Sequence, residues 1–287
     1  MGKVFIGKYT RNKALSELDF SKGELRHIKT YENLQYCSYL QFKNNTLYAL
    51  NENVKWDNGY LIILNNNLIQ KKDSYGINPC YVNVNKYIII CNYSSETICI
   101  YDNDKLKCKV CIKNSLPHCA IEYNKQIIVI DKNNRLFIIN SEMQVNCLYE
   151  FKSNTEPRHI VVKDNVFYII SEKSNELFVF YDYNFIESIK ISKGNGCAIK
   201  IYNDYLFTTS RETDEINVFS IKHKIKPVLI QTISSHGKNP RDMDFFDNYL
   251  LVCNVDSNNI SIFKFDKILK YYSSFYVEKP FSICFKK

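Results

Sequence analysis

Charged residues recur at two positions of a repeated strand pattern, and these are the residues that could do chemistry. In the stretch TEPRHIVVKDNVFYIISEKSNELFVFYD, Arg158 follows a proline at the start of one expected strand, and Glu172 follows the end of the next. Antiparallel strands joined by a tight turn bring these two positions to the same edge of a sheet. A guanidinium binds carboxylate or phosphate through paired hydrogen bonds, and a carboxylate can activate water. The pair therefore indicates a site for an anionic substrate.

The same two positions are found in the other copies of the pattern. After the proline position stand Ser38, Cys80, His118, Arg158, Cys197, Arg241 and Phe281, and at the end of the second strand stand Lys8, Glu52, Asn92, Asp131, Glu172, Arg211 and Asn254. We expect one arc to gather His118, Asp131, Arg158, Glu172, Arg211 and Arg241. Such a mixture favours a binding site over a purely structural polar rim, which remains the alternative.

The copies are spaced at about forty residues, which is typical of the blades of a β-propeller. Prolines stand at positions 79, 117, 157, 240 and 280, and units begin near 36, 79, 117, 157, 196 and 240. Asn and Asp take the turn positions, and no segment has a sustained helical period. The sequence predicts an all-β fold, a seven-bladed β-propeller of four-stranded antiparallel blades that forms a single domain over residues 1–287. The last blade would be closed by N- and C-terminal strands.

Charge and cysteine content limit which binding partners and which cellular compartment we expect for this protein. The net charge is +8, but the lysines are scattered rather than clustered, so we expect no nucleic acid to bind. No run is long and apolar enough to cross a membrane, and MGKVFIGKYT lacks a signal-peptide core. The eleven cysteines then suggest reduced, buried thiols in a cytoplasmic protein, and the lone CxxC of Cys108 and Cys111 is a weak metal or redox signal. We expect a monomer or a weak oligomer.

At this point the chain resembles the lactonase family of seven-bladed propellers, which includes propeller-type 6-phosphogluconolactonases and fungal 3-carboxymuconate cyclases. The matching stretches are FIGKYT, NPCYV…CNYSSETICIYD, LPHCA…IDKNNRL, EPRHIVV…SEKSNELFVF, TTSRETDEINVFSI and NPRDMDF…NVDSNNISIFKF. The resemblance implies a site formed by a His, two Arg and a Glu. These match His118, Arg158, Arg241 and Glu172, while Arg211 matches the family's NR motif.

The chain departs from the family pattern at a few positions. Ser171 replaces the usual Asn before Glu172, Asp242 replaces the usual Gly after Arg241, and Tyr81 stands where a His is common. The SPDG hairpin residues are missing from most units. These differences leave the expected fold intact but bear on the substrate.

The resemblance implies hydrolysis of a sugar lactone, with 6-phosphogluconolactone of the pentose phosphate pathway as the leading candidate and with no cofactor. Glu172 or His118 would be the general base, and Arg158, Arg241, Arg211 and Asp131 would bind the small anionic lactone. A metal-dependent variant would use Glu52, Asp131 and Glu172. His159 should point away from Arg158 and pack in the core.

Two other functions stay open. One is a cyclase or isomerase that joins a carboxylate to a double bond with the same arginines. The other is a non-catalytic propeller that binds protein or ligand. A rim in which Arg158 and Glu172 bond to each other and to backbone, with no cleft beside them, would favour the non-catalytic protein.

Overall fold

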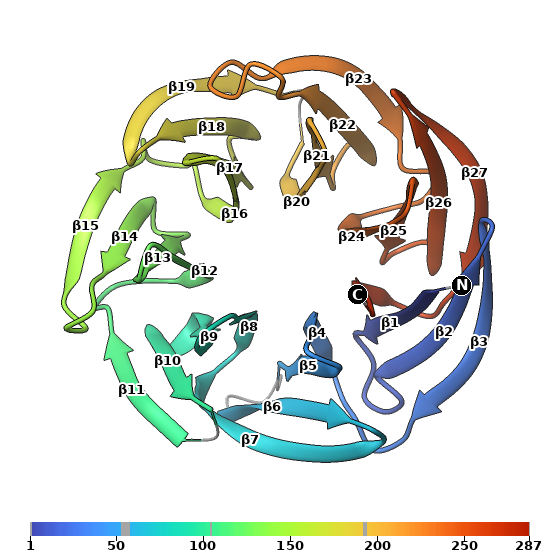
Figure 1. Ribbon diagram of the computed structural model, residues 1–287, viewed down its shortest axis with the longest axis horizontal. Coiled ribbons are helices and arrows are strands. Elements are labelled where there is room, and N and C mark those ends of the chain that lie inside the picture. The colour runs from blue at the N-terminus through green and yellow to red at the C-terminus, as the bar shows by residue number, and fades with distance from the viewer. Residues whose placement is uncertain (1, 53–57, 104, 192–193, 287) are drawn as a thin grey trace.

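The computed structural model describes residues 2–52, 58–103, 105–191 and 194–286, and these form seven four-stranded antiparallel sheets around a central channel (Figure 1). The predicted propeller is therefore confirmed. The one helical segment among the described residues is the short 3-10 turn η1 (Tyr93–Ser95). No helix among them is long and apolar enough to span a membrane.

Six blades are continuous in sequence, with the first strand innermost. The strands of blades 1 and 2 are β4 (Cys37–Lys43), β5 (Thr46–Asn51), β6 (Asn58–Asn65), β7 (Leu68–Ile77), β8 (Pro79–Val84), β9 (Ile88–Asn92), β10 (Thr97–Asp102) and β11 (Lys105–Cys111). Those of blades 3 and 4 are β12 (Pro117–Tyr123), β13 (Gln126–Asp131), β14 (Arg135–Ile139), β15 (Val145–Glu150), β16 (Pro157–Lys163), β17 (Val166–Ser171), β18 (Glu176–Tyr181) and β19 (Asn184–Lys190). Those of blades 5 and 6 are β20 (Gly196–Tyr202), β21 (Tyr205–Ser210), β22 (Glu215–Ser220), β23 (Val228–Ser234), β24 (Pro240–Phe246), β25 (Tyr249–Asn254), β26 (Asn259–Asp266) and β27 (Ile268–Tyr276).

Blade 7 is built from both ends of the chain, as predicted. Its strands are β28 (Pro280–Phe285), β1 (Gly2–Lys8), β2 (Leu15–Ser21) and β3 (Glu24–Tyr31). β28 pairs with β1, so that Phe5 lies opposite Cys284 and Ile6 opposite Ile283. The ring is closed by backbone hydrogen bonds between the two ends, which removes two open sheet edges.

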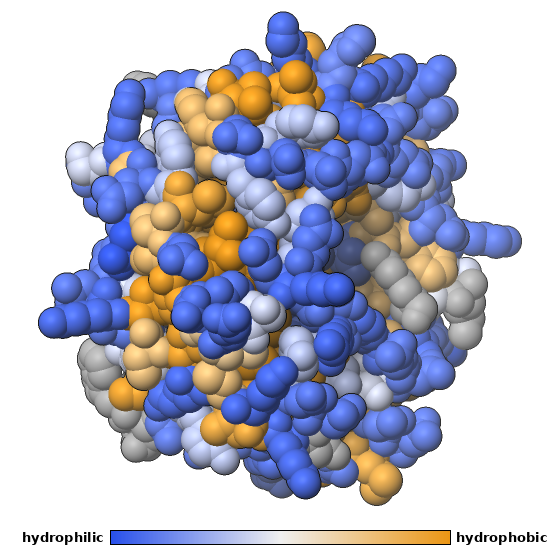
Figure 2. Space-filling model, turned by 60° about the vertical axis from the view of Figure 1, so that its left-hand side comes forward, coloured by the Kyte–Doolittle hydropathy of each residue, from blue (hydrophilic) through white to orange (hydrophobic). Residues whose placement is uncertain are grey.

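The hydrophobic core lies between neighbouring blades, where alternate side chains of the inner strands interlock. Aromatic rings fill several of these interfaces, for example Tyr202 of β20 stacked 4.4 Å from Phe245 of β24. The fourth strands lie outermost in the ring (Figure 1). They expose some apolar side chains, such as those of Phe185 and Ile186 in β19. Figure 2 shows apolar residues among polar ones on one side of the molecule. Blade-to-blade packing therefore fixes the angle at which each inner strand meets the channel.

Asparagine and aspartate turns set the ends of the strands. Asn44, Asn124, Asp164, Asn203 and Asp247 each adopt a left-handed φ in the hairpin between the first two strands of a blade. Asn and Asp tolerate this conformation better than most residues, which accounts for the low glycine content.

Candidate functional site

A recurrent irregularity at the start of the inner strands aims side chains into the channel. In β16 the pairing with β17 shifts between Pro157, which lies opposite Ser171, and His159, which lies opposite Ile170. Arg158 is the extra residue of this β-bulge. A bulge breaks the alternation of side chains between the two faces of a strand. Arg158 and His159 can therefore both reach the same cluster.

Arg158 and Glu172 meet, as the strand ends predicted. Arg158 Nε lies 3.3 Å from Glu172 Oε2, and Arg158 Nη1 donates a 2.8 Å hydrogen bond to the carbonyl oxygen of Cys197 in the next blade. Glu172 also receives Arg211, with Nη2 2.6 Å from Oε1, and Lys132, with Nζ 3.1 Å from Oε2. Three cations from three blades thus surround one carboxylate. We call this group, together with His118 and Arg241, the arginine rim.

The charge state of Glu172 follows from these partners. Burial would raise the pKa of its carboxyl, but Arg158, Arg211 and Lys132 outweigh that effect and lower the pKa to about 2. A carboxylate with so low a pKa is a weak base near neutral pH. The contacts therefore favour Glu172 as the group that holds the arginines in place, rather than as the predicted general base.

The two histidines lie together in the channel. The ring centroids of His118 and His159 are 5.1 Å apart, and Arg158 Nη1 lies 3.1 Å from His159 Nδ1. The expectation that His159 points away from Arg158 is wrong, because the bulge brings both side chains to one side. Burial, and then the charge of Arg158, lowers the pKa of both imidazoles well below the usual value. Both are therefore neutral near pH 7.

Arg241 lies against an aromatic wall. Its guanidinium carbon sits 3.7 Å from the ring centroid of Phe281. The ring of Tyr9 stacks on Phe281, with centroids 4.5 Å apart, and lies tilted against Tyr36 at 5.1 Å. Arg241 forms no ion pair with any described carboxylate. Burial, with the nearby charges of Arg158 and Arg211, lowers its pKa to about 10, so that it remains a cation near neutral pH.

A narrow cavity joins these groups at the channel mouth. It is lined by Ser38, Tyr39, Glu52, Cys80, Arg158, His159, Arg241, Asp242 and Phe281. The space open to the centre of a water molecule is about 10 Å³, roughly enough for one water. Arg211, which does not line this cavity, borders a separate open groove of about 400 Å³ between blades 5 and 6.

Glu52 is one of the two carboxylates that line this cavity, the other being Asp242, and the sequence prediction gave Glu52 a part only in a metal-dependent reaction. It follows β5 of blade 1, at the same repeat position as Glu172 in blade 4. Burial raises the pKa of Glu52, and Arg241, Asn78 and Arg158 only partly offset this. Its position in the repeat was the signal that could have identified it.

Asp131 does not join the arginine rim. One of its carboxylate oxygens accepts hydrogen bonds from the backbone nitrogens of Leu116 and Asn133, and the other is paired with Arg135 of the same blade. The side chain is fully buried. These contacts stabilise the turn after β13 and leave Asp131 without a clear role in binding substrate.

Among the described residues, no group of three His, Cys, Asp or Glu side chains is placed to hold a metal ion. The set considered for a metal-dependent reaction, Glu52, Asp131 and Glu172, is thus not gathered into a metal site. Glu172 is instead surrounded by cations, and Asp131 is bonded within its blade.

Comparison with known proteins places this ring and rim in a family. The family model described as lactonase, 7-bladed beta-propeller, matches residues 3–112 and 135–285. The chain belongs to this lactonase family. An uncharacterised Staphylococcus saprophyticus protein is 23% identical, over 92% of each chain.

Solved structures of low identity share the fold. A Bacteroides fragilis protein, provisionally described as a 6-phosphogluconolactonase, is 19% identical, with a TM-score of 0.86 over 99% of this chain and 97% of its own. The periplasmic gluconolactonase of Pseudomonas aeruginosa is 16% identical, with a TM-score of 0.86 over 99% of this chain and 98% of its own. The four positions matched to the lactonase family site, His118, Arg158, Glu172 and Arg241, lie within or beside one cluster here.

Proposed function

We propose that this lactonase-family propeller hydrolyses an anionic sugar lactone, with 6-phosphogluconolactone as the leading candidate. The observation that carries the proposal is the convergence of Arg158, Arg211 and Arg241 at one channel mouth, where Glu172 is already shared by two of them and Lys132. The rim keeps an excess of positive charge, which favours a phosphate or carboxylate.

Arg241 is the group best placed to take that anion. It has no carboxylate partner among the described residues, and the Phe281 ring supports one face of its guanidinium. A planar, fixed guanidinium offers paired donors to a phosphate or carboxylate. Arg158 is held by Glu172 and by the Cys197 carbonyl, so it can stabilise charge that develops on the lactone carbonyl oxygen without having to move.

We assign the general base to Glu52 in place of Glu172. Its carboxylate shares the cavity with Arg158 and Arg241, and its raised pKa makes it a better proton acceptor than a carboxylate held by three cations. Glu52 would take a proton from water as the water oxygen attacks the lactone carbonyl carbon. The ring C–O bond then breaks, and the proton passes to the departing ring oxygen, which yields the open hydroxy acid. Neutral His118 would serve as a hydrogen-bonding group nearby.

The test is hydrolysis of freshly prepared 6-phosphogluconolactone, measured against its spontaneous rate, with uncharged gluconolactone as the comparison substrate. We expect the phosphorylated lactone to be favoured, and Arg241→Ala to raise its KM with little effect on gluconolactone. Purified protein that accelerates neither lactone above the buffer rate would reject the proposal.

One observation favours a second candidate, a non-catalytic propeller that binds an anion. Arg158 is bonded to Glu172 and to a backbone carbonyl, and the cavity beside it is small. Tight binding of 6-phosphogluconate with no turnover of any lactone would support this candidate. The cyclase alternative would show itself as turnover of an unsaturated dicarboxylate in the same substrate panel.

A further inference from the structure

A second hollow lies on the opposite face of the ring, between blades 1 and 2. It has a volume of about 490 Å³ and is bordered by the hairpins that join β4 to β5, β6 to β7, β8 to β9 and β10 to β11. These hairpins lie at the far ends of the inner strands from the arginine rim. The hollow is therefore separate from the lactonase site.

The inner strand on one side of the hollow, β4, ends in a lysine. In blades 3, 5 and 6 the last residue of the inner strand is Tyr123, Tyr202 or Phe246, and each packs on aromatic rings of the next blade. In blade 1 that position is Lys43, whose ammonium donates a 2.7 Å hydrogen bond to Asn85 Oδ1. Blade 4 also has a lysine there, Lys163, which bonds to Asn203 and Asp204 of the next blade. The end of β4 therefore adds no aromatic ring to the interface beside the hollow.

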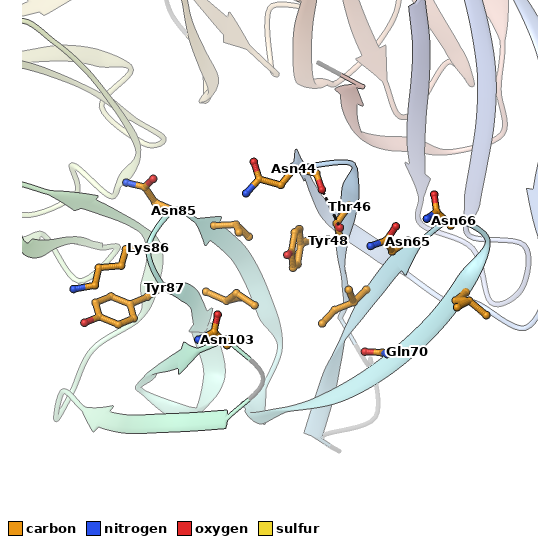
Figure 3. Close-up of a pocket in the computed structure, with 14 residues that line it drawn as sticks. Asn44, Thr46, Tyr48, Asn65, Asn66, Gln70, Asn85, Lys86, Tyr87 and Asn103 are labelled. Atoms are coloured by element: carbon orange, nitrogen blue, oxygen red, sulfur yellow. Dashed lines mark hydrogen bonds between the residues drawn. The ribbon is translucent and has the colours of Figure 1, made fainter.

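The walls of the hollow are neutral and rich in amides. The lining residues are Asn44, Thr46, Tyr48, Ile63, Asn65, Asn66, Leu68, Gln70, Val84, Asn85, Lys86, Tyr87, Ile88 and Asn103. They include no carboxylate, and the one lysine turns its ammonium away from Tyr48 (Figure 3). Figure 3 shows Tyr48, Asn65 and Gln70 on the blade 1 side and Asn103 on the blade 2 side, while the amide of Asn85 points away from Tyr48. We call this hollow the amide groove.

Turn geometry explains only part of this composition. Asn44, Asn66 and Asn103 have left-handed φ angles, for which asparagine is a common choice. Asn65 and Gln70 lie in β6 and β7 with ordinary strand conformation. Neither side chain forms a hydrogen bond with any other described residue. Their amides are therefore available to a ligand.

We propose that the amide groove binds a neutral, hydroxyl-rich small molecule such as a mono- or disaccharide. A side-chain amide both donates and accepts hydrogen bonds, as a sugar hydroxyl does. Ile63, Val84 and Ile88 supply the aliphatic part of the lining, which can contact the C–H groups of a sugar. The volume falls within the range of small-molecule sites. This proposal does not depend on lactone hydrolysis.

The experiment uses the full chain and a panel of probes: glucose, maltose, cellobiose and lactose, with glucose 6-phosphate as the charged comparison. Binding is measured by saturation-transfer NMR and by calorimetry, with each probe at up to about 50 mM, since a small polar ligand of this kind binds in the millimolar range. The test variant is the double substitution Asn65→Ala/Gln70→Ala. The matched control is Asn184→Ala, an exposed amide beside the corresponding β18–β19 turn of blade 4.

We expect at least one neutral probe to bind, the double variant to weaken it about tenfold or more, and Asn184→Ala to leave it unchanged. The effect should persist when Arg241→Ala has altered the arginine rim. The proposal fails if no neutral probe binds, or if binding survives the double variant. It also fails if binding is lost in Arg241→Ala but kept in the double variant, because the ligand would then lie at the rim.

Discussion

The two faces of this propeller differ in how their polar side chains are paired. On the arginine rim, four buried or half-buried charged groups from three blades are joined through Glu172, and the remaining cavity is barely larger than a water molecule. In the amide groove, mostly uncharged side chains line a hollow of about 490 Å³, and the side chains of Asn65 and Gln70 form no hydrogen bond with another described residue. Buried charges are stable only when they are paired, whereas exposed amides can hydrogen-bond to water when no ligand is bound. The side chains of the arginine rim should therefore be rigid and necessary for a stable fold, whereas those of the amide groove should be dispensable for folding.

The largest effect should come from Arg158→Ala. It removes a partner of Glu172, leaves the Cys197 carbonyl without its donor and takes away a charge needed for catalysis. We expect kcat/KM for the lactone to fall about a hundredfold or more, and unfolding free energy to fall by about 3–5 kcal/mol. Steady-state kinetics measure the fall in kcat/KM, and urea unfolding measures the fall in unfolding free energy. Asn65→Ala/Gln70→Ala should change neither, and a fully active Arg158→Ala protein would remove the distinction between the two faces.

Glu52→Gln should separate chemistry from stability within the rim. Glu52 makes no ion pair with a described residue, so we expect stability to stay within about 1 kcal/mol while kcat falls about a hundredfold to ten-thousandfold. The groups that face it are Arg241, Arg158, Asn78 and the Tyr9 ring. In the wild type, kcat/KM should decline as pH falls through the raised pKa of Glu52. Retention of full activity in Glu52→Gln would reassign the base.

Asp242→Ala tests whether the rim is tied to ring closure. Asp242 follows Arg241, and its carboxylate accepts hydrogen bonds from the backbone nitrogens of Met243 and, in the C-terminal strand, Ile283. Loss of these buried acceptors should cost about 1–3 kcal/mol of unfolding free energy. Chemical denaturation of this variant and of the control Asp266→Ala, at an exposed position that ends β26, measures the difference. Equal stabilities would show that the closing strand does not need Asp242.

Acid should weaken the rim before it affects the groove. Glu172 has a folded-state pKa of about 2, below its unfolded value, so its contribution is present near neutral pH and is lost as pH falls from about 5 toward 2. His118 and His159 are held neutral, and protonation of the unfolded chain below about pH 6.5 adds to the loss. Thermal unfolding across pH 3–8 should show stability falling as the pH is lowered. The dependence of stability on pH should be shallower for Glu172→Gln. A slope unchanged in that variant would contradict the assignment.

The smallest effect on fold and hydrolysis should come from Asn65→Trp. Asn65 is exposed and lines the hollow, so an indole ring at this position should fill part of it. We expect stability to change by no more than about 1 kcal/mol, lactone kinetics to stay as in the wild type and sugar binding to disappear. Sugar titrations with the filled variant check this, and undiminished binding would place the ligand elsewhere.

The sequence predicted the ring well because its evidence is local and repeated. Prolines and asparagine turns at a constant spacing locate each inner strand, and antiparallel pairing then brings Arg158 to Glu172. The roles of individual side chains were harder to predict, because they depend on contacts between blades. Lys132 lies one residue beyond a strand end, yet it helps to lower the pKa of Glu172, and the bulge at Arg158 turns His159 into the channel.

Asp131 was predicted to join the site but is bound within its own blade. Its repeat position matches that of Glu172, but Arg135 and two backbone nitrogens of its own blade bind its carboxylate first. Glu52 occupies an equivalent position with no such neighbour and stays in the cavity. Position in a repeat predicts which edge a side chain reaches, but not which partner it meets there.

The pairing of β28 with β1 has a consequence for synthesis on the ribosome. Of the described strands β1 is translated first, and the strand that covers its inner edge, Pro280–Phe285, is translated after all the others. At typical rates of synthesis the nascent chain carries that open edge for roughly 10–60 s. During this interval a strand from a neighbouring nascent chain could pair there instead, so we expect chaperones that shield unpaired edges to raise the yield of this protein most when many copies are translated side by side.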